Sequence, residues 1–231
     1  MKYDWLLFDL DNTILDFDQA MVFGFEKTIN DFKIPFDENH FSIYQNINHG
    51  CWADLEKGII TQDELRTLRM ERFLNHIDST HNPIHFSETY HGNLSAKIFW
   101  MDNAQSLIED WSSQFKLALV TNGLKEIQRA RLVKSDLGKH FHHVVISDEI
   151  GVAKPHAGFF DHVFDKINFP EKEKVMIIGD SLSSDIRGGN DYGIDTCWLN
   201  LNGKVAPEDN VPTFTIEKLE ELQGIISSGS L

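Results

Sequence analysis

The sequence predicts an α/β fold in which a parallel β-sheet core carries an inserted, all-helical domain. Two observations indicate this fold. Short apolar runs alternate with helical stretches over most of the chain, which favours a parallel sheet covered by helices on both faces. Residues 15–97, in contrast, contain no convincing strand, and an insertion this long suggests a second domain. We therefore expect a core of residues 1–14 and 98–231 and a helical domain of residues 15–97.

Each predicted strand is a short run of apolar residues. The first, Tyr3–Asp9, contains Trp5-Leu6-Leu7-Phe8, which is typical of a strand buried on both faces. The others are Lys116–Thr121, Val144–Ser147, Lys174–Gly179, Thr196–Leu199 and Phe214–Ile216. Helices are expected between them at Ala104–Ser113, Lys125–Leu137, Gly158–Asn168 and Ser184–Tyr192. Ligands of such sheets bind at the carboxyl ends of the strands, so the residues that follow each strand are the first candidates for a site.

Four helices are predicted in the insert from apolar residues that recur at helical spacing. The first ends at Ile34-Pro35. The second has an apolar stripe from Phe41 to Leu55 and is terminated by Gly58. A capping box, Thr61-Gln62-Asp63-Glu64, begins the third. The fourth is expected over Ser87–Ile98.

The composition excludes several classes of function. The chain has 21 Lys and Arg against 36 Asp and Glu, a net charge of −15, which disfavours a nucleic-acid polymer or an anionic membrane as partner. Apolar runs are too short to span a bilayer, and Asp4 and Asp9 bracket the early one, unlike in a signal peptide. Cys51 and Cys197 form no metal or redox motif. We expect a cytoplasmic globular protein; its oligomeric state is not indicated.

The motif Asp9-Leu10-Asp11-Asn12-Thr13 follows the first strand. Residues i and i+2 just past a strand can point to the same side, so two carboxyl groups can enter one site. Their repulsion is relieved by a divalent cation such as Mg²⁺, which takes one or two protein carboxylates and keeps waters and substrate oxygens. The alternative is a pair of Asp residues that only form the turn after the strand.

Three further motifs follow predicted strands. Asp180-Ser181-Leu182-Ser183-Ser184-Asp185 could complete the oxygen site, or Ser183 or Ser184 could cap a helix with Asp185 in its first turn. Thr121-Asn122-Gly123 offers hydroxyl and amide donors for a phosphoryl oxygen, or forms only a turn. Lys154, before Pro155, could reach inward or be an ordinary surface lysine.

Together, the four motifs resemble those of the haloacid dehalogenase (HAD) superfamily, in the family's order. They are Asp9-x-Asp11-x-Thr13, Thr121-Asn122-Gly123, Lys154-Pro155 and Gly179-Asp180-Ser181-x-x-x-Asp185. The resemblance implies a Rossmann-like core and, from the insert, the helical-cap subclass. It also implies that Asp9 is a nucleophile that forms an aspartyl phosphate and that Asp11 is the general acid and base.

The same resemblance implies which motif residues bind the metal and which bind the phosphoryl group. Mg²⁺ is expected on the side chains of Asp9 and Asp180 and the backbone carbonyl of Asp11, with Asp185 orienting metal-bound waters. Thr121, the Asn122 amide and Lys154 are expected to hold phosphoryl oxygens. An intact acid at Asp11 favours phosphate esters over carbon–halogen bonds, since halide leaves without protonation.

Two stretches are similar to the bacterial pyrimidine 5′-nucleotidases of this superfamily, which implies a nucleoside 5′-monophosphate as substrate. They are Gly179–Asn200, in which Gly188 and Gly189 allow close helix packing, and Ile47–Trp52. The alternatives are a phosphatase for phosphoglycolate or a sugar phosphate, a mutase, a dehalogenase or a non-catalytic binding module.

Two residues of the insert are candidates for contact with a base. Trp52 could stack on it and Asn48, four residues earlier on the same helix face, could read its edge. The alternative is that Trp52 only packs in the apolar stripe. We expect the arginines of the third helix on a solvated face with neighbouring acids, namely Arg66, Arg69 and Arg72 with Asp63 and Glu64. The eleven histidines are expected mostly at the surface.

Overall fold

The computed structural model describes residues 2–35 and 37–227. Residues 1 and 228–231 of the predicted core and residue 36 of the predicted insert therefore lie outside the described residues. The chain forms two compact units. We call residues 1–17, 99–125 and 132–231 the core unit and residues 18–98 and 126–131 the helical unit. Nothing in the sequence indicates that residues 126–131 belong to the helical unit.

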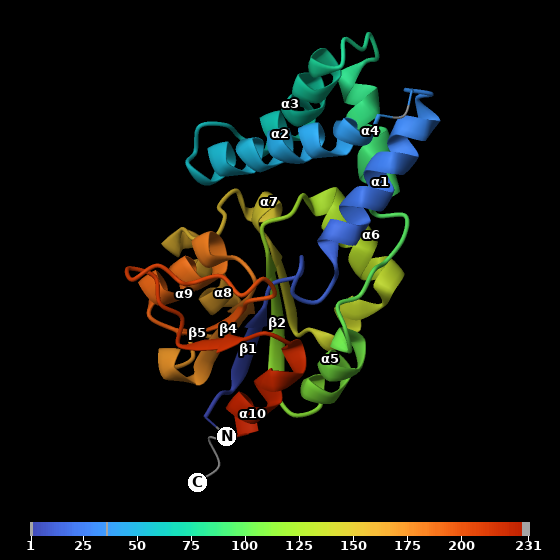
Figure 1. Ribbon diagram of the computed structural model, residues 1–231. Coiled ribbons are helices and arrows are strands. Elements are labelled where there is room, and N and C mark those ends of the chain that lie inside the picture. Colours follow the sequence, from blue (N-terminus) through green and yellow to red (C-terminus); the bar gives the residue numbers. More distant parts are fainter. Residues whose placement is uncertain (1, 36, 228–231) are drawn as a thin grey trace. The chain divides into compact units, whose positions relative to one another are not determined.

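The core unit contains a six-stranded parallel sheet with the order β3-β2-β1-β4-β5-β6 (Figure 1). This order is typical of Rossmann-type sheets, so the predicted fold class is confirmed. The strands lie within two residues of their predicted bounds. They are β1 (Trp5–Phe8), β2 (Lys116–Thr121), β3 (His143–Ile146), β4 (Val175–Gly179), β5 (Asp195–Leu199) and β6 (Phe214–Ile216). The order reverses beside β1, where ligands of such sheets bind.

Helices cover both faces of this sheet. The Phe8 ring stacks on Trp111 of α5 with centroids 5.7 Å apart, whereas Leu7 packs in a cluster with Phe159 of α8. Because adjacent strand residues point to opposite faces, α5 and α8 lie on opposite sides. The helices are α5 (Ala104–Ser112), α6 (Lys125–Ser135), α7 (Ser147–Ile150), α8 (Ala157–Lys166), α9 (Arg187–Tyr192) and α10 (Leu222–Ser227). Neither α7 nor α10 was expected from the sequence.

Two adjacent glycines in α9 permit the close packing that we expected there. A Cβ atom on Gly188 would lie 2.6 Å from the Phe160 ring, and one on Gly189 would lie 2.5 Å from the Thr196 methyl group. Any larger residue would therefore push α9 away from α8 and the sheet.

The helical unit is built from α1 (Phe17–Asp31), α2 (Glu38–Glu56), α3 (Gln62–His76) and α4 (Pro83–Leu94). The predicted capping box is present, since Thr61 Oγ1 accepts from the Glu64 amide and the Glu64 carboxylate accepts from the Thr61 amide. The bounds predicted for the fourth helix are wrong. Asn82 caps it by accepting from the Ile84 and His85 amides, so it begins at Pro83, and it ends before Ile98.

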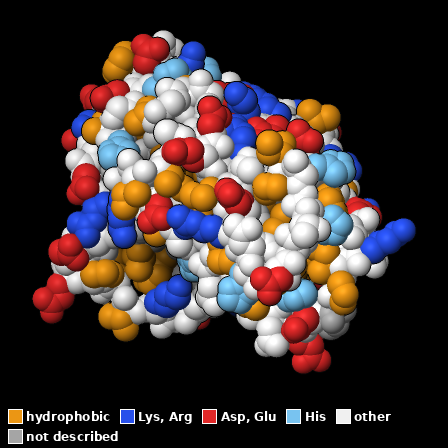
Figure 2. Space-filling model, turned by 90° about the horizontal axis from the view of Figure 1, so that it is seen from above, with side chains coloured by type: hydrophobic (Ala, Val, Ile, Leu, Met, Phe, Trp, Pro, Cys, Tyr) orange, Lys and Arg blue, Asp and Glu red, His pale blue; other side chains and the backbone are white. Residues whose placement is uncertain are grey.

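Charged side chains of both signs are interspersed on the face seen in Figure 2. The net charge of −15 therefore forms no continuous acidic area on this face. Among the described residues, no helix is both long and apolar enough to cross a membrane.

Candidate active site

The nucleophile predicted from the sequence lies directly after β1. Asp9 is 7 % exposed because it continues a strand whose residues are all buried. The chain then turns tightly: Asn12 adopts a left-handed conformation with φ of 57° and its side chain accepts from the Phe17 amide. This turn keeps Asp11 near the strand end, close enough for its charge to raise the pKa of Asp9.

Lys154 connects three parts of the site. Its ammonium donates to Asp9 Oδ1 at 2.7 Å, to Asp185 Oδ1 at 2.6 Å and to the Val120 carbonyl oxygen at 2.7 Å. The side chain is 1 % exposed, so Lys154 is not the ordinary surface lysine of the alternative interpretation. An ammonium group has three N–H donors, and protein oxygens occupy all three.

The carboxylates of Asp9, Asp180 and Asp185 converge, with an oxygen of each within 4.8 Å of the others. Burial and the neighbouring carboxylates together raise the pKa of Asp9 to about 7 and that of Asp180 to about 8, against the opposing effect of Lys154. Burial alone would lower the pKa of Lys154, but Asp185 and Asp9 outweigh it, so this pKa is raised.

The donor set of this cluster fits a divalent cation. Three ionised carboxylates and one ammonium carry a net charge of −2, and carboxylate oxygens are the ligands that Mg²⁺ prefers. A cation of charge +2 would balance the cluster and hold Asp9 and Asp180 ionised at neutral pH.

The carboxylates of the cluster differ in the number of hydrogen bonds that they accept from protein groups. Asp185 accepts from Lys154 and, through Oδ2, from the Ser181 amide at 3.1 Å. Its Oδ2 lies so close to Gly179 that a Cβ there would be 2.2 Å away. No hydrogen bond from residues 2–35 or 37–227 ends on the Asp180 carboxylate. Asp180 and the second oxygen of Asp9 are therefore the better direct ligands, and the indirect role predicted for Asp185 fits its two contacts.

Ser181 organises the turn after β4. Its hydroxyl accepts from the Ser184 amide at 3.3 Å and caps a π-helical turn, Leu182–Ile186, that leads into α9. The proposed caps Ser183 and Ser184 are therefore wrong, because the turn begins two residues earlier than expected. The Trp198 indole donates to the Asp180 carbonyl oxygen at 2.9 Å and fixes the start of this turn.

The predicted phosphate-binding residues follow β2 at the same edge of the sheet. Thr121 is 1 % exposed, and its hydroxyl accepts from the Gly123 amide at 3.2 Å. The Asn122 side chain bonds twice to the Lys154 backbone. The structure thus brings Thr121, Asn122 and Lys154 to one strand end, while their contact with a phosphoryl group stays a prediction.

Asn48 and Trp52 of α2 differ in their surroundings. Asn48 is 7 % exposed, and its side-chain oxygen accepts from Arg69 at 2.8 Å. Trp52 is half-buried. Their contact with a base stays a prediction.

The solvated arginine face predicted for α3 is wrong at Arg69, which is 1 % exposed. Its guanidinium donates to Asn48 and to His91 Nε2, the latter at 2.8 Å. Arg69 lies four residues from both Leu65 and Phe73, which are also buried, and this shared helical spacing is the signal that could have placed it inside. The predicted pairing with Glu64 is also wrong, because that carboxylate caps α3.

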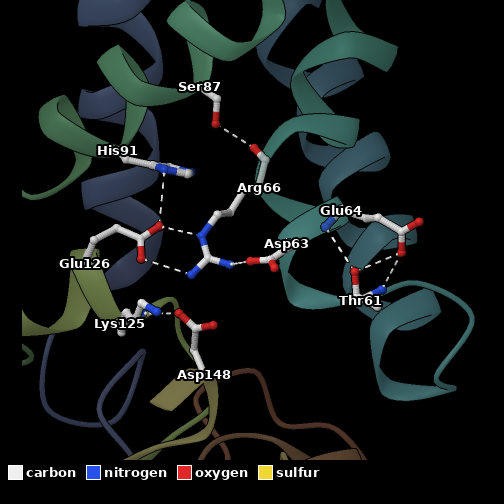
Figure 3. Close-up of polar contacts among 9 residues, drawn as sticks. All are labelled: Thr61, Asp63, Glu64, Arg66, Ser87, His91, Lys125, Glu126 and Asp148. Carbon is white, nitrogen blue, oxygen red and sulfur yellow. Dashed lines mark hydrogen bonds and ion pairs between the residues drawn. The ribbon is translucent and has the colours of Figure 1, made fainter. Parts of the chain in front are cut away.

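A second polar cluster, formed by Arg66, Glu126, Asp63 and His91, lies in the helical unit (Figure 3). Arg66 binds both Glu126 oxygens, at 2.9 and 3.1 Å, and Asp63 at 2.9 Å. His91 Nδ1 lies 3.8 Å from Glu126. Because arginine only donates, His91 Nε2 accepts from Arg69 and the ring proton is on Nδ1. Burial and the Arg69 charge lower the pKa of His91 to about 3, so this buried histidine, unlike the surface histidines we expected, stays neutral.

Known proteins that are similar to this chain belong to the family that its motifs resemble. A model of the haloacid dehalogenase-like hydrolase family matches residues 6–199. Escherichia coli pyrimidine 5′-nucleotidase YjjG is 32 % identical over 98 % of this chain and 99 % of its own. Streptococcus pneumoniae pyrimidine 5′-nucleotidase PynA is 32 % identical over 96 % and 94 %.

A solved structure extends this similarity to three dimensions. YfnB of Bacillus subtilis, crystallised with bound magnesium, is 36 % identical and superimposes with a TM-score of 0.91. The match covers 98 % of this chain and 99 % of YfnB.

Proposed function

The chain belongs to the haloacid dehalogenase-like hydrolase family, and we propose that it is a Mg²⁺-dependent phosphatase of pyrimidine nucleoside 5′-monophosphates. The observation that carries the phosphatase chemistry is the buried cluster in which three carboxyl groups, those of Asp9, Asp180 and Asp185, converge beside the ammonium of Lys154. Support for the nucleotide comes from YjjG and PynA, which are named pyrimidine 5′-nucleotidases.

Asp9 attacks phosphorus in this mechanism. One carboxylate oxygen of Asp9 forms the new bond to phosphorus, in line with the ester oxygen that leaves, while Lys154 orients the carboxylate through Oδ1. Asp11 donates a proton to that oxygen and later takes one from the water that hydrolyses the aspartyl phosphate. This second step releases phosphate and restores both carboxyl groups.

Mg²⁺ would be held by Asp9, Asp180 and the carbonyl oxygen of Asp11, with Asp185 orienting its waters. When bound, it offsets the negative charge of the phosphoryl oxygens. Thr121, the Asn122 amide and Lys154 would bind those oxygens, Lys154 by exchanging one of its three protein acceptors for a phosphoryl oxygen. Residues 15–97 act as a cap domain that selects the substrate and excludes water.

A substrate panel tests the proposal. The panel compares kcat/KM for pyrimidine and purine nucleoside monophosphates, phosphoglycolate, a sugar phosphate and a 2-haloacid, each with Mg²⁺ and with EDTA. We expect Mg²⁺-dependent phosphate release that is fastest with a pyrimidine nucleotide, and a loss of about 10⁴-fold or more in Asp9→Asn, which lacks the nucleophile. Metal-independent halide release, or preference for phosphoglycolate, would instead support one of the alternatives.

Trp52→Ala tests the contact with the base. If the indole stacks on a pyrimidine, KM for the nucleotide rises by about 5–150-fold, since base–aromatic stacking contributes about 1–3 kcal/mol. The control is p-nitrophenyl phosphate, which lacks the base and should show little change in KM. Equal changes for both substrates would indicate that Trp52 only packs.

A further inference from the structure

We propose that the side chain of Asn122 is a positioning residue that holds Lys154 in place. This role is distinct from phosphate binding by the Asn122 backbone amide, and it rests on the proposed phosphatase function. The side chain would act on the reaction only through Lys154.

Two reciprocal hydrogen bonds join Asn122 to the backbone of Lys154. The Lys154 amide donates to Asn122 Oδ1 at 2.9 Å, and Asn122 Nδ2 donates to the Lys154 carbonyl oxygen at 2.8 Å. The asparagine thus satisfies both backbone groups of the lysine, as a neighbouring strand would. Lys154 needs such a partner, because it lies between α7 and α8 in residues 151–156, outside any strand.

The end of β2 therefore holds Lys154 at both ends of its side chain. Val120 accepts a hydrogen bond from Nζ, and Asn122, two residues later, binds the backbone. Between these two points the lysine is buried. The position of its ammonium is set by one short segment of the sheet.

Small displacements of this ammonium have large consequences. All three of its hydrogens are used, two of them on the carboxylates of Asp9 and Asp185. A shift of the Lys154 backbone would lengthen one of these bonds and leave a buried carboxylate without its counter-charge. It would also release Asp9 from the orientation that in-line attack requires, and such misplacement lowers the rate more than it weakens binding.

The chain contains a matched control for this arrangement. Asn200 makes the same two bonds to Lys204: the Lys204 amide donates to Asn200 Oδ1 at 2.9 Å, and Asn200 Nδ2 donates to the Lys204 carbonyl oxygen at 2.8 Å. Lys204 is exposed and has no part in the site. Asn200→Ala therefore removes the same bonds as Asn122→Ala without disturbing Lys154.

The experiment measures kcat and KM of the full-length chain with Mg²⁺ and p-nitrophenyl phosphate for both variants. We expect Asn122→Ala to lower kcat about 10–100-fold, the range for partners that orient a functional group, with KM changed less than about threefold. Asn200→Ala should keep wild-type kcat, with a loss in Tm similar to that of Asn122→Ala. Wild-type kcat in Asn122→Ala, or an equal loss of kcat in Asn200→Ala, would overturn the inference.

Amide hydrogen exchange gives a readout that does not depend on catalysis. Asn122→Ala should speed exchange of the Lys154 backbone amide, whereas Asn200→Ala should leave it unchanged. If the wild-type chain had no phosphatase activity, the proposed function would fail, but hydrogen exchange would still test whether Asn122 holds the Lys154 backbone. Unchanged exchange at Lys154 in Asn122→Ala would show that the asparagine does not hold it.

Discussion

Lys154 in the core unit and Arg69 in the helical unit are both 1 % exposed, yet their partners differ. Lys154 donates to two carboxylates and one carbonyl oxygen. Arg69 donates to Asn48 and to a histidine that burial keeps neutral. One buried cation is outnumbered by acids and the other has only uncharged direct partners.

The difference separates a reactive cluster from a structural one. Around Lys154, burial and the surplus of carboxyl groups raise the pKa values of Asp9 and Asp180, and a divalent cation would offset the charge of these groups once they ionise. Around Arg69, burial and the positive charge keep His91 neutral, so the guanidinium donates only to uncharged groups. Perturbed pKa values occur in both places, so the charge balance, not the perturbation alone, distinguishes the candidate active site.

Replacing each buried cation by methionine should give the largest difference between the two clusters. Lys154→Met leaves Asp9 and Asp185 buried without their counter-charge, which should cost about 3–5 kcal/mol of unfolding free energy. It also removes the group that holds Asp9, so kcat should fall about 10²–10³-fold. Thermal unfolding with Mg²⁺ and assays with p-nitrophenyl phosphate measure both effects.

Arg69→Met is the matched substitution in the helical unit. It leaves Asn48 Oδ1 and His91 Nε2 without a donor, which should cost about 1–3 kcal/mol. Because p-nitrophenyl phosphate has no base for α2 to recognise, its kcat should change less than about threefold, far below the effect of losing a transition-state contact. Equal losses of kcat in the two variants would mean that the two cations do not differ as their partners indicate.

The metal-free core should lose stability as pH rises. Asp9 and Asp180 keep their protons to pH values near 7 and 8 in the folded chain, but only to about pH 4 when unfolded. Their contribution is thus complete below about pH 4 and is lost as pH rises through 7 and 8, by about 5 kcal/mol between pH 5.5 and 8.5. Saturating Mg²⁺ should abolish this loss, because both carboxyls are then ionised throughout.

Asp180→Asn provides the control for this pH dependence. It removes one of the two carboxyls with a raised pKa, so thermal unfolding in EDTA should depend less steeply on pH than in the wild-type chain. The same variant should bind Mg²⁺ more weakly by calorimetry. A wild-type slope in Asp180→Asn would show that other groups cause the loss of stability.

Local patterns predicted which core residues the structure brings together, because each motif directly follows a short apolar strand. Position in the motif was enough to choose Asp9, Asp180 and Lys154, since parallel strands bring their carboxyl ends together. The partner of the Lys154 backbone, the Asn122 side chain, was not predictable in this way. That Asn122 binds its backbone depends on a separation of 32 residues, which no local pattern carries.

The helical unit was predicted less accurately because its helices pack through tertiary contacts. Asn82-Pro83 is a usable start signal for α4 that the apolar spacing of Ser87–Ile98 obscured. Arg69 has the spacing of a core position, but an arginine is rarely buried, so composition argued against the correct interpretation. The contact of Arg66 with Glu126 joins residues 60 positions apart, and no local sequence pattern indicates it.

His91 should make stability depend on pH in the direction opposite to Asp9 and Asp180, and by a smaller amount. Its pKa is lowered to about 3 in the folded chain from about 6.5 when unfolded. Above pH 6.5 the imidazole is neutral in both states and costs nothing. As pH falls toward 3, only the unfolded chain takes up the proton, so about 2–3 kcal/mol of stability should be lost by pH 4.5.

His91→Gln isolates this effect, because glutamine can accept from Arg69 and donate toward Glu126 but does not titrate. Carboxyl groups elsewhere titrate in both proteins, so the quantity to measure is the difference in unfolding free energy between wild type and variant at pH 4.5 and at pH 7.5. We expect the variant to gain on the wild type as pH falls. Parallel pH profiles would mean that His91 is protonated in the folded chain. Its Nε2 could then not accept from Arg69, and the neutral surroundings that set Arg69 apart from Lys154 would not exist.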